Sequence, residues 1–188
     1  MSGRVEIILG CMFSGKSSEL IRRLSRYDAV GIKTLIVNSE LDTRTGKSVK
    51  THSNIEKKAF KSLKLMDIID TNEYKISQVI GIDESQFFPD LLKFVIKSEK
   101  DNKIVIIAGL DGDSNRKPFG QILQCIPLCD EVVKLNAMDM ISNDGTPAIF
   151  TKRVVRNNEQ ICIGAKGDYI AVSRNNYLSD RNQTAPNK

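Results

Sequence analysis

The chain has 188 residues, of which 40% are hydrophobic and 27% are charged, as in an ordinary globular protein. A chain of this length buries roughly 70% of its unfolded surface. We therefore expect one domain with a small appendage, stable without disulfides or a structural metal. The net charge of +5 is too modest to indicate a nucleic-acid partner. The single histidine, His52, excludes a mechanism that needs two.

The cysteines and the apolar runs narrow the class further. Cys11, Cys125, Cys129 and Cys162 form no CxxC pair, so we expect neither a zinc ribbon nor a disulfide framework. No apolar run approaches the roughly 20 residues that a membrane span needs, and the start of the chain has no features of a secretory signal. We therefore expect a reduced, cytoplasmic protein that binds no membrane.

In chain order, short β-branched runs alternate with helical segments up to residue 135. We expect strands at 5–9, 33–38, 78–83, 103–109 and 131–135, and helices at 17–30 and 87–99. Pro89 is expected in the first turn of the second helix. Strands separated by helices predict an α/β fold with a parallel, doubly wound sheet. The strand at 103–109 is apolar enough to be buried on both faces.

After residue 136 the pattern becomes rich in short strands and turns. We expect short strands at 148–155, 160–163 and 169–172, and turns at 143–145 and 164–167. The predicted division is an α/β domain at 1–135, a β-rich appendage at 136–178 and a disordered tail at 179–188. The polar stretch 39–48 predicts a mobile loop, and the basic run 57–61 predicts a solvated face.

Residues 10–17 match the GxxxxGK[ST] motif between a predicted strand and a predicted helix, and we call them the phosphate loop. Glycines let backbone N–H groups converge on phosphate oxygens, and the helix N-terminus adds partial positive charge. Lys16 then reaches the β- and γ-phosphates, and the Ser17 hydroxyl ligates Mg²⁺. The loop consists of Gly10, Cys11, Met12, Phe13, Ser14, Gly15, Lys16 and Ser17.

Two adjacent acidic residues lie at the end of the expected strand at 78–83 and in the turn that follows it. The first, Asp83, is expected at the carboxyl edge of the sheet beside the phosphate loop, where it can hold Mg²⁺ through water. The second, Glu84, can accept a proton from an attacking hydroxyl as a general base. These residues leave two function classes open: a small-molecule kinase, or an NTPase coupled to nucleic acid or to conformational work.

Several longer motifs resemble the type II, cellular-type thymidine kinase family, in register over roughly residues 4–178. They lie at 10–20, 83–88, 108–112, 116–120, 134–137 and 151–153. The resemblance implies a P-loop (RecA-like) fold with helices on both faces of the sheet, and a small β-rich lasso domain. It also implies transfer of the ATP γ-phosphoryl group to the 5′-hydroxyl of thymidine or deoxyuridine, in nucleoside salvage for DNA synthesis, by a homotetramer. The acid that matches Glu84 is the family's catalytic base.

The resemblance also implies contacts residue by residue. Beyond the phosphate loop, contacts to ATP fall to Asp42, Thr43, Arg44, Asp83, Glu84, Ser85 and Gln86. Contacts to the nucleoside fall to Met12, Phe87, Leu110, Thr151, Ile161, Cys162, Ile163, Gly164 and Tyr169. Among these, Met12 and Leu110 face the base methyl and Phe87 lines the base pocket. The backbone of 161–164 reads the pyrimidine edge, and Tyr169 lies near the sugar.

The sequence departs from the family first in the lasso, which we define as residues 136–178. The family's four zinc ligands fall at Asp139 and Ser142 and at Ser173 and Asn176, with Asp144 as an alternative in the first pair. Oxygen groups of this kind do not make a structural zinc site, so we predict no zinc. Hairpin packing, turn chemistry or a partner subunit must then hold a more mobile lasso.

The second departure lies beside the expected base pocket. After residues 111–112 the family carries Thr-Phe, whose ring stacks on the base, but here Asp113 and Ser114 follow. Loss of that ring removes about 1 kcal/mol of stacking. Binding is then weaker, another ring such as Phe119 or Tyr169 fills the gap, or nucleoside preference has shifted. The alternative function is a catalytically impaired paralogue that binds nucleotide or protein partners.

Overall fold

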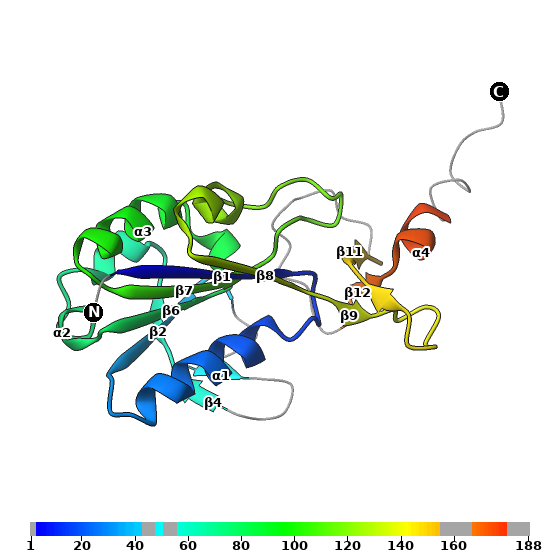
Figure 1. Ribbon diagram of the computed structural model, residues 1–188. Coiled ribbons are helices and arrows are strands. Elements are labelled where there is room, and N and C mark those ends of the chain that lie inside the picture. The colour runs from blue at the N-terminus through cyan, green and yellow to red at the C-terminus, as the bar shows by residue number, and fades with distance from the viewer. Residues whose placement is uncertain (1–2, 43–47, 51–55, 155–166, 180–188) are drawn as a thin grey trace.

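The computed structural model describes residues 3–42, 48–50, 56–154 and 167–179. Its largest feature is a six-stranded sheet, in which all neighbouring strands are parallel and the order is β5-β2-β6-β7-β1-β8 (Figure 1). The strands are β1 (Arg4–Gly10), β2 (Thr34–Ser39), β5 (Phe60–Ser62), β6 (Val79–Asp83), β7 (Ile104–Gly109) and β8 (Glu131–Leu135). The predicted parallel α/β sheet is therefore confirmed.

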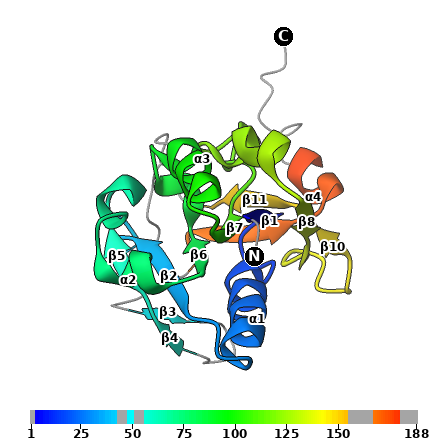
Figure 2. The ribbon, with the colours of Figure 1, turned by 60° about the vertical axis from the view of Figure 1, so that its left-hand side comes forward.

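Helices cover both faces of the sheet, as predicted (Figure 2). Helix α1 (Lys16–Asp28) packs Leu20 and Leu24 against one face, and α3 (Leu91–Lys100) packs Phe94 into a separate core on the other. Shorter helical segments extend the second layer, at η1 (Leu65–Ile68), α2 (Asn72–Ile76) and η3 (Ile122–Leu128). Every residue of β7 is buried, because apolar layers lie on both of its sides. Among the described residues, no helix has the length and apolar character needed to cross a membrane.

The second predicted helix begins later than residue 87. The turn η2 (Ser85–Phe87) comes first, and α3 starts at Leu91 after its N-cap residue Asp90. The expectation that Pro89 lies inside the first helical turn is wrong, because Phe88 before it is extended, with φ −91° and ψ 115°. Proline disfavours the helical conformation in the residue that precedes it. Phe87 is therefore fixed in a tight turn at the sheet edge.

The segment between β2 and β6 contains strands that the sequence did not predict. Strands β3 (Ser48–Lys50) and β4 (Glu56–Lys58) pair antiparallel, and β5 adds a parallel edge strand beside β2. The expected solvated face is wrong for the end of that run: Ala59 is buried, Phe60 packs against the core, and Lys61 Nζ donates to the Asp42 carbonyl at 3.0 Å. Pairing with β2 provides this burial, and local composition does not reveal it.

The lasso lies beyond the carboxyl ends of β1 and β8 (Figure 1). In its described residues, 136–154 and 167–178, there are two antiparallel pairs, β9 (Ala137–Met138) with β10 (Pro147–Ala148) and β11 (Phe150–Arg153) with β12 (Tyr169–Val172), and α4 (Arg174–Ser179) follows. The predicted turn adopts left-handed conformations at Asn143 (φ 51°) and Gly145 (φ 86°). The predicted strand at 160–163 lies outside the described residues, as does most of the predicted turn at 164–167.

Candidate active site

The phosphate loop forms the predicted strand–turn–helix unit. Strand β1 ends at Gly10, and α1 begins at Lys16 after Gly15, whose φ of 87° is a conformation that glycine adopts at little cost. Within the part of the chain that the structure describes, the Ser14 hydroxyl is buried and has no hydrogen-bond partner. A buried polar group of this kind calls for a ligand or a water. The turn therefore fits a bound phosphate, which would accept hydrogen bonds at this helix N-terminus.

Lys16 and Ser17 face the predicted acids across the edge of the sheet. The Ser17 hydroxyl donates to Asp83 Oδ1 at 3.0 Å, although 66 positions separate the two residues. Burial lowers the pKa of Lys16, whereas the Glu84 and Asp83 carboxylates oppose that shift. Burial, together with the Glu84 charge, raises the pKa of Asp83. A cation placed here would offset this cost, and the paired oxygens of Ser17 and Asp83 suit Mg²⁺.

The Lys16 side chain is occupied within its own loop. Its Nζ atom donates to the Cys11 carbonyl at 2.7 Å, and only 8% of the residue is exposed. An ammonium group held in this way can be redirected to a phosphate oxygen without moving the helix that carries it. The loop thus keeps a positive charge in a dry environment, where its interaction with an anion is strong.

Glu84 has an unusual backbone for a residue with a side chain. Its φ and ψ of 49° and 41° are left-handed, a conformation that persists where the surroundings fix it and that clusters at functional sites. Gln86 Nε2 donates to Glu84 Oε2 at 2.6 Å, and the Phe87 N–H donates to the Glu84 carbonyl at 3.1 Å. The residue is partly exposed. Its carboxylate is therefore held at the sheet edge while solvent still reaches it.

Several residues predicted to contact the nucleoside come together around this edge. Thr151 on β11 accepts a hydrogen bond at 2.9 Å from the Met12 N–H, which joins the lasso to the phosphate loop. Leu110 follows β7 and is nearly buried. The rings of Phe87 and Phe119 meet edge to face, with centroids 5.8 Å apart. The ring of Phe87, which the resemblance assigns to the base pocket, is thus in edge-to-face contact with the ring of Phe119.

Tyr169 is nearly buried on β12. Its hydroxyl accepts from Arg153 Nε at 3.1 Å, and the guanidinium of Arg153 lies 5.2 Å from the centre of its ring. Two further predicted contacts are buried: Asp42, whose Oδ2 accepts from Asn38 Nδ2 at 3.2 Å, and Ser85 in η2. The predicted contacts at Thr43, Arg44, Ile161, Cys162, Ile163 and Gly164 lie outside the described residues.

The loop that carries Ser114 is tied to α4 by a residue that sequence reasoning missed. The hydroxyl of Tyr177 donates to the Ser114 carbonyl at 2.8 Å, and the guanidinium of Arg116 lies over the rings of Tyr177 and Phe150, 4.7 and 5.3 Å from their centres. A lone tyrosine near the end of the family resemblance gave no signal for this role. These contacts fix the position of Ser114 although the stacking ring is absent.

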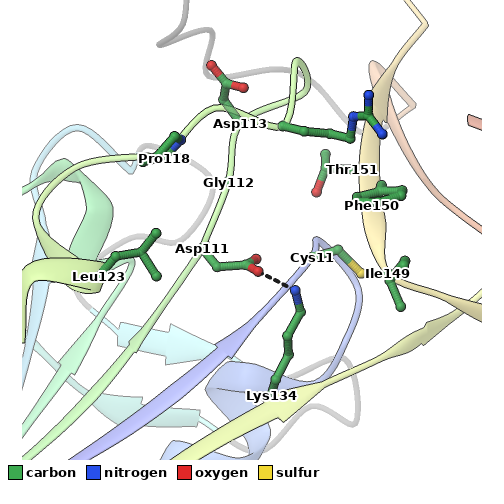
Figure 3. Close-up of a pocket in the computed structure, with 11 residues that line it drawn as sticks. Cys11, Asp111, Gly112, Asp113, Pro118, Leu123, Lys134, Ile149, Phe150 and Thr151 are labelled. Carbon is green, nitrogen blue, oxygen red and sulfur yellow. Dashed lines mark hydrogen bonds and ion pairs between the residues drawn. The ribbon is translucent and has the colours of Figure 1, made fainter. Parts of the chain in front are cut away.

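A cavity of about 280 Å³ lies between the loop after β7, strand β8 and strand β11 (Figure 3). It is lined by Cys11, Asp111, Gly112, Asp113, Arg116, Pro118, Leu123, Lys134, Ile149, Phe150 and Thr151. Lys134 Nζ and Asp111 Oδ2 form an ion pair at 2.5 Å across its floor. Burial raises the pKa of the Cys11 thiol, which disfavours the reactive thiolate form.

The four positions that the resemblance assigns to zinc ligands are joined by hydrogen bonds. Asp139 is 1% exposed. Its Oδ2 accepts from the Ser173 N–H at 2.6 Å and from Asn176 Nδ2 at 2.8 Å, and its Oδ1 accepts from the N–H groups of Ile141 and Ser142 at 2.8 and 3.1 Å. Asn176 Nδ2 also lies 2.9 Å from the Ser142 hydroxyl. One buried carboxylate thus links the turn after β9 to the start of α4.

The charge state of Asp139 follows from these bonds. Burial by itself raises the pKa of its carboxyl, but the hydrogen bonds from Ser173, Ser142 and Ile141 outweigh burial and hold that pKa below its ordinary value. The alternative zinc position, Asp144, accepts from the N–H of Thr146 within its own turn. Among the described residues there is no group of three or more His, Cys, Asp or Glu that could hold a metal ion.

A parallel sheet with a GxxxxGK[ST] loop opposite paired carboxylates is typical of the α/β class of P-loop proteins. The family described as thymidine kinase matches residues 3–177. The thymidine kinases of myxoma virus (strain Uriarra) and vaccinia virus (strain Western Reserve) are each 41% identical over 176 residues, which cover 94% of this chain and 97% of each relative. That of raccoon poxvirus is 42% identical over 178 residues, or 95% and 98%. The chain belongs to the thymidine kinase family, as the resemblance predicted.

Proposed function

We propose that the chain transfers the γ-phosphoryl group of ATP to the 5′-hydroxyl of thymidine, with Mg²⁺ as the cofactor. The observation that carries the proposal is the meeting of Ser17 with Asp83 at 3.0 Å, next to Lys16 and Glu84. Groups that bind phosphate and a group that accepts a proton thereby share one sheet edge. Membership of the thymidine kinase family and the activity for which its viral relatives are named support thymidine as the acceptor.

On the phosphate side, the backbone N–H groups of the phosphate loop and the Lys16 ammonium bind the phosphates. Ser17 and Asp83 would hold Mg²⁺, which neutralises charge on the phosphate oxygens when bound. Asp42 and Arg44 belong to the same proposal through the family resemblance, with Arg44 adding positive charge beside the transferred group. Charges fixed in a dry site cost little reorganisation during the reaction.

On the nucleoside side, Glu84 accepts the proton of the 5′-hydroxyl while that oxygen attacks the γ-phosphorus of ATP, the bond from this phosphorus to the β–γ bridging oxygen breaks, and ADP leaves. The proton ends on a carboxylate oxygen of Glu84. Met12, Leu110 and Phe87 bind the base, and the lasso covers it. Holding both substrates at one edge of the sheet aligns the attacking and leaving oxygens. Such alignment of bound reactants supplies a large part of the rate enhancement of an enzyme. The cytoplasmic location, the homotetramer and the division at residue 135 stay predictions.

Phosphate transfer to a panel of nucleosides tests the proposal. Purified protein with ATP and Mg²⁺ is offered thymidine, deoxyuridine, deoxycytidine, deoxyadenosine and deoxyguanosine, and labelled monophosphates are separated. We expect thymidine to be the preferred acceptor, because family relationship covers both halves of the site. ATP binding without transfer to any nucleoside would favour the impaired paralogue, and a different preferred nucleoside would correct the substrate.

A ring restored at residue 114 tests the altered base pocket. The Ser114→Phe variant is expected to lower the KM for thymidine about fivefold, because one stacking contact contributes about 1 kcal/mol. The kcat should stay unchanged, since the reacting groups are untouched. Ser114→Ala is the matched control, because both variants keep the carbonyl that accepts from Tyr177. An unchanged KM in the Phe variant would show that another ring, such as Phe119, already fills the place.

A further inference from the structure

Gln86 lies behind Glu84 and bonds in two directions. Its side chain is buried, with 4% of the residue exposed. The Nε2 atom donates to Glu84 Oε2 at 2.6 Å, and the Oε1 atom accepts from the Leu110 N–H at 3.0 Å. One amide group thus connects the carboxylate at the end of β6 to the backbone that follows β7.

The chemistry of the two partners fixes the orientation of this amide. A carboxylate accepts hydrogen bonds and a backbone N–H donates them, so the amide nitrogen must face Glu84 and the amide oxygen must face Leu110. Rotating the amide by 180° would place donor against donor and acceptor against acceptor. The donor to the carboxylate is therefore held at one place, and a bond to an ionised acceptor is among the stronger ones.

Two glycines pack closely against Gln86, Gly109 against its side chain and Gly120 against its backbone. A Cβ atom at Gly109 would lie 3.0 Å from Gln86 Oε1. A Cβ at Gly120, whose φ is 64°, would lie 2.8 Å from the Gln86 Cα atom and would collide with its carbonyl oxygen. The side chain and the backbone of Gln86 are both packed where no larger neighbour fits. Its position is consequently set by the sheet and by the segment 116–120.

We propose that Gln86 is the positioning residue that orients the Glu84 carboxylate toward the acceptor hydroxyl. The inference rests on the proposed role of Glu84 as the base. Glu84 is partly exposed and lies on a left-handed turn, and the bond from Gln86 Nε2 sets the direction of its carboxylate. Both polar ends of Gln86 are engaged within the protein, which favours this role over a direct contact with ATP.

A double-mutant cycle of Gln86→Met and Glu84→Gln tests the proposal through thymidine kcat. Methionine keeps the length of the side chain and removes both hydrogen bonds. We expect Gln86→Met alone to lower kcat roughly 10- to 100-fold, with little change in the KM for ATP, because a base held about 1 Å out of place loses much of its effect. In the Glu84→Gln background the same change should lower kcat no further.

Gln121→Met is the matched control, because Gln121 Oε1 accepts from the Leu92 N–H at 3.0 Å, a bond of the same kind. Gln121 is half-buried and loses one bond, so this variant should lower the melting temperature less than Gln86→Met does and should leave kcat unchanged. Gln86→Glu keeps an acceptor for Leu110 and places a second carboxylate beside Glu84, so it should also lower kcat if the Met variant does not fold.

Three outcomes would decide against the inference or its basis. Wild-type kcat in Gln86→Met or in Gln86→Glu would overturn it. A full additional loss in the double variant would also overturn it, since Gln86 would then act independently of Glu84. Wild-type kcat in Glu84→Gln alone would instead remove the proposed base, and with it the proposed function, whatever the Gln86 variants do.

Discussion

Replacing Glu84 by Gln is expected to lower the kcat for thymidine by at least about 100-fold, because an amide does not accept a proton at neutral pH and general-base catalysis contributes about 10²- to 10⁴-fold. Glutamine has nearly the same shape and can keep a hydrogen bond to Gln86. Binding of an ATP analogue should therefore be unchanged, since Lys16 and the phosphate loop are intact. Initial rates at saturating ATP and thymidine, with analogue binding by calorimetry, measure both quantities.

A control must show that the loss of kcat in Glu84→Gln does not come from removing a negative charge at this edge of the sheet. Glu40 provides the control, because it is exposed and follows β2 at the same edge of the sheet. Glu40→Gln removes the same charge and should keep the wild-type kcat. The Glu84→Gln variant should melt close to the wild type, because it relieves the repulsion that, with burial, raises the pKa of Asp83, but it also loses the attraction that opposes the lowered pKa of Lys16. Full activity in Glu84→Gln would contradict the assigned base.

Replacing Asp139 by Asn is expected to destabilise the lasso by about 2–4 kcal/mol. An asparagine amide has one acceptor where the carboxylate has two. Its NH₂ group would then face either the donors at Ser173 and Asn176 or those at Ile141 and Ser142. Buried donors without acceptors are costly. Limited proteolysis and thermal unfolding at pH 7 measure the loss.

The same bonds predict how the loss depends on pH. The folded-state pKa of Asp139 lies below the unfolded value of about 4. The carboxylate thus contributes its full stability above that unfolded value, and this contribution is lost as pH falls through the folded pKa. The difference in stability between wild type and Asp139→Asn should be constant near neutrality and should shrink below about pH 4.

A consequence for substrate binding follows from the connection of the lasso to the phosphate loop. Ser173 follows β12, which pairs with β11, and Thr151 on β11 accepts from the Met12 N–H. A loosened lasso should therefore raise the KM for thymidine more than it lowers kcat. Asp144→Asn is the control in the same turn, because Asp144 is exposed and bonds only locally to Thr146 in the described structure. It should change neither quantity much.

Metal analysis completes the test of the lasso. Because hydrogen bonds join the four positions expected for zinc ligands, treatment with EDTA should leave the melting temperature of the wild type unchanged. Elemental analysis should find no stoichiometric zinc. One zinc per chain would refute the metal-free interpretation, and a lasso insensitive to Asp139→Asn would show that hairpin packing or a partner subunit holds it instead.

The sequence by itself determined the fold class and the phosphate-binding half of the candidate site. Strand β7 is a continuous apolar run, β6 is apolar up to Asp83, and β1 is apolar apart from Arg4 and Glu6. The phosphate loop is a contiguous motif, so these features can be predicted from the local sequence. The Asp83–Glu84 pair was readable for the same reason, since acids after a buried strand mark the sheet edge. Family resemblance added Phe87, Leu110 and Thr151, which periodicity could not have distinguished from core residues.

Tertiary structure alone decided the features that depend on pairing across long separations. Strand β5 is partly buried because it pairs with β2, the Asp139 carboxylate is buried because four donors converge on it, and Gln86 connects residues that follow β6 and β7. In each case polar residues are involved, and their local sequence predicts exposure to solvent. Its burial is stable because partners from distant positions satisfy its hydrogen bonds, and such convergence leaves no periodic trace along the chain.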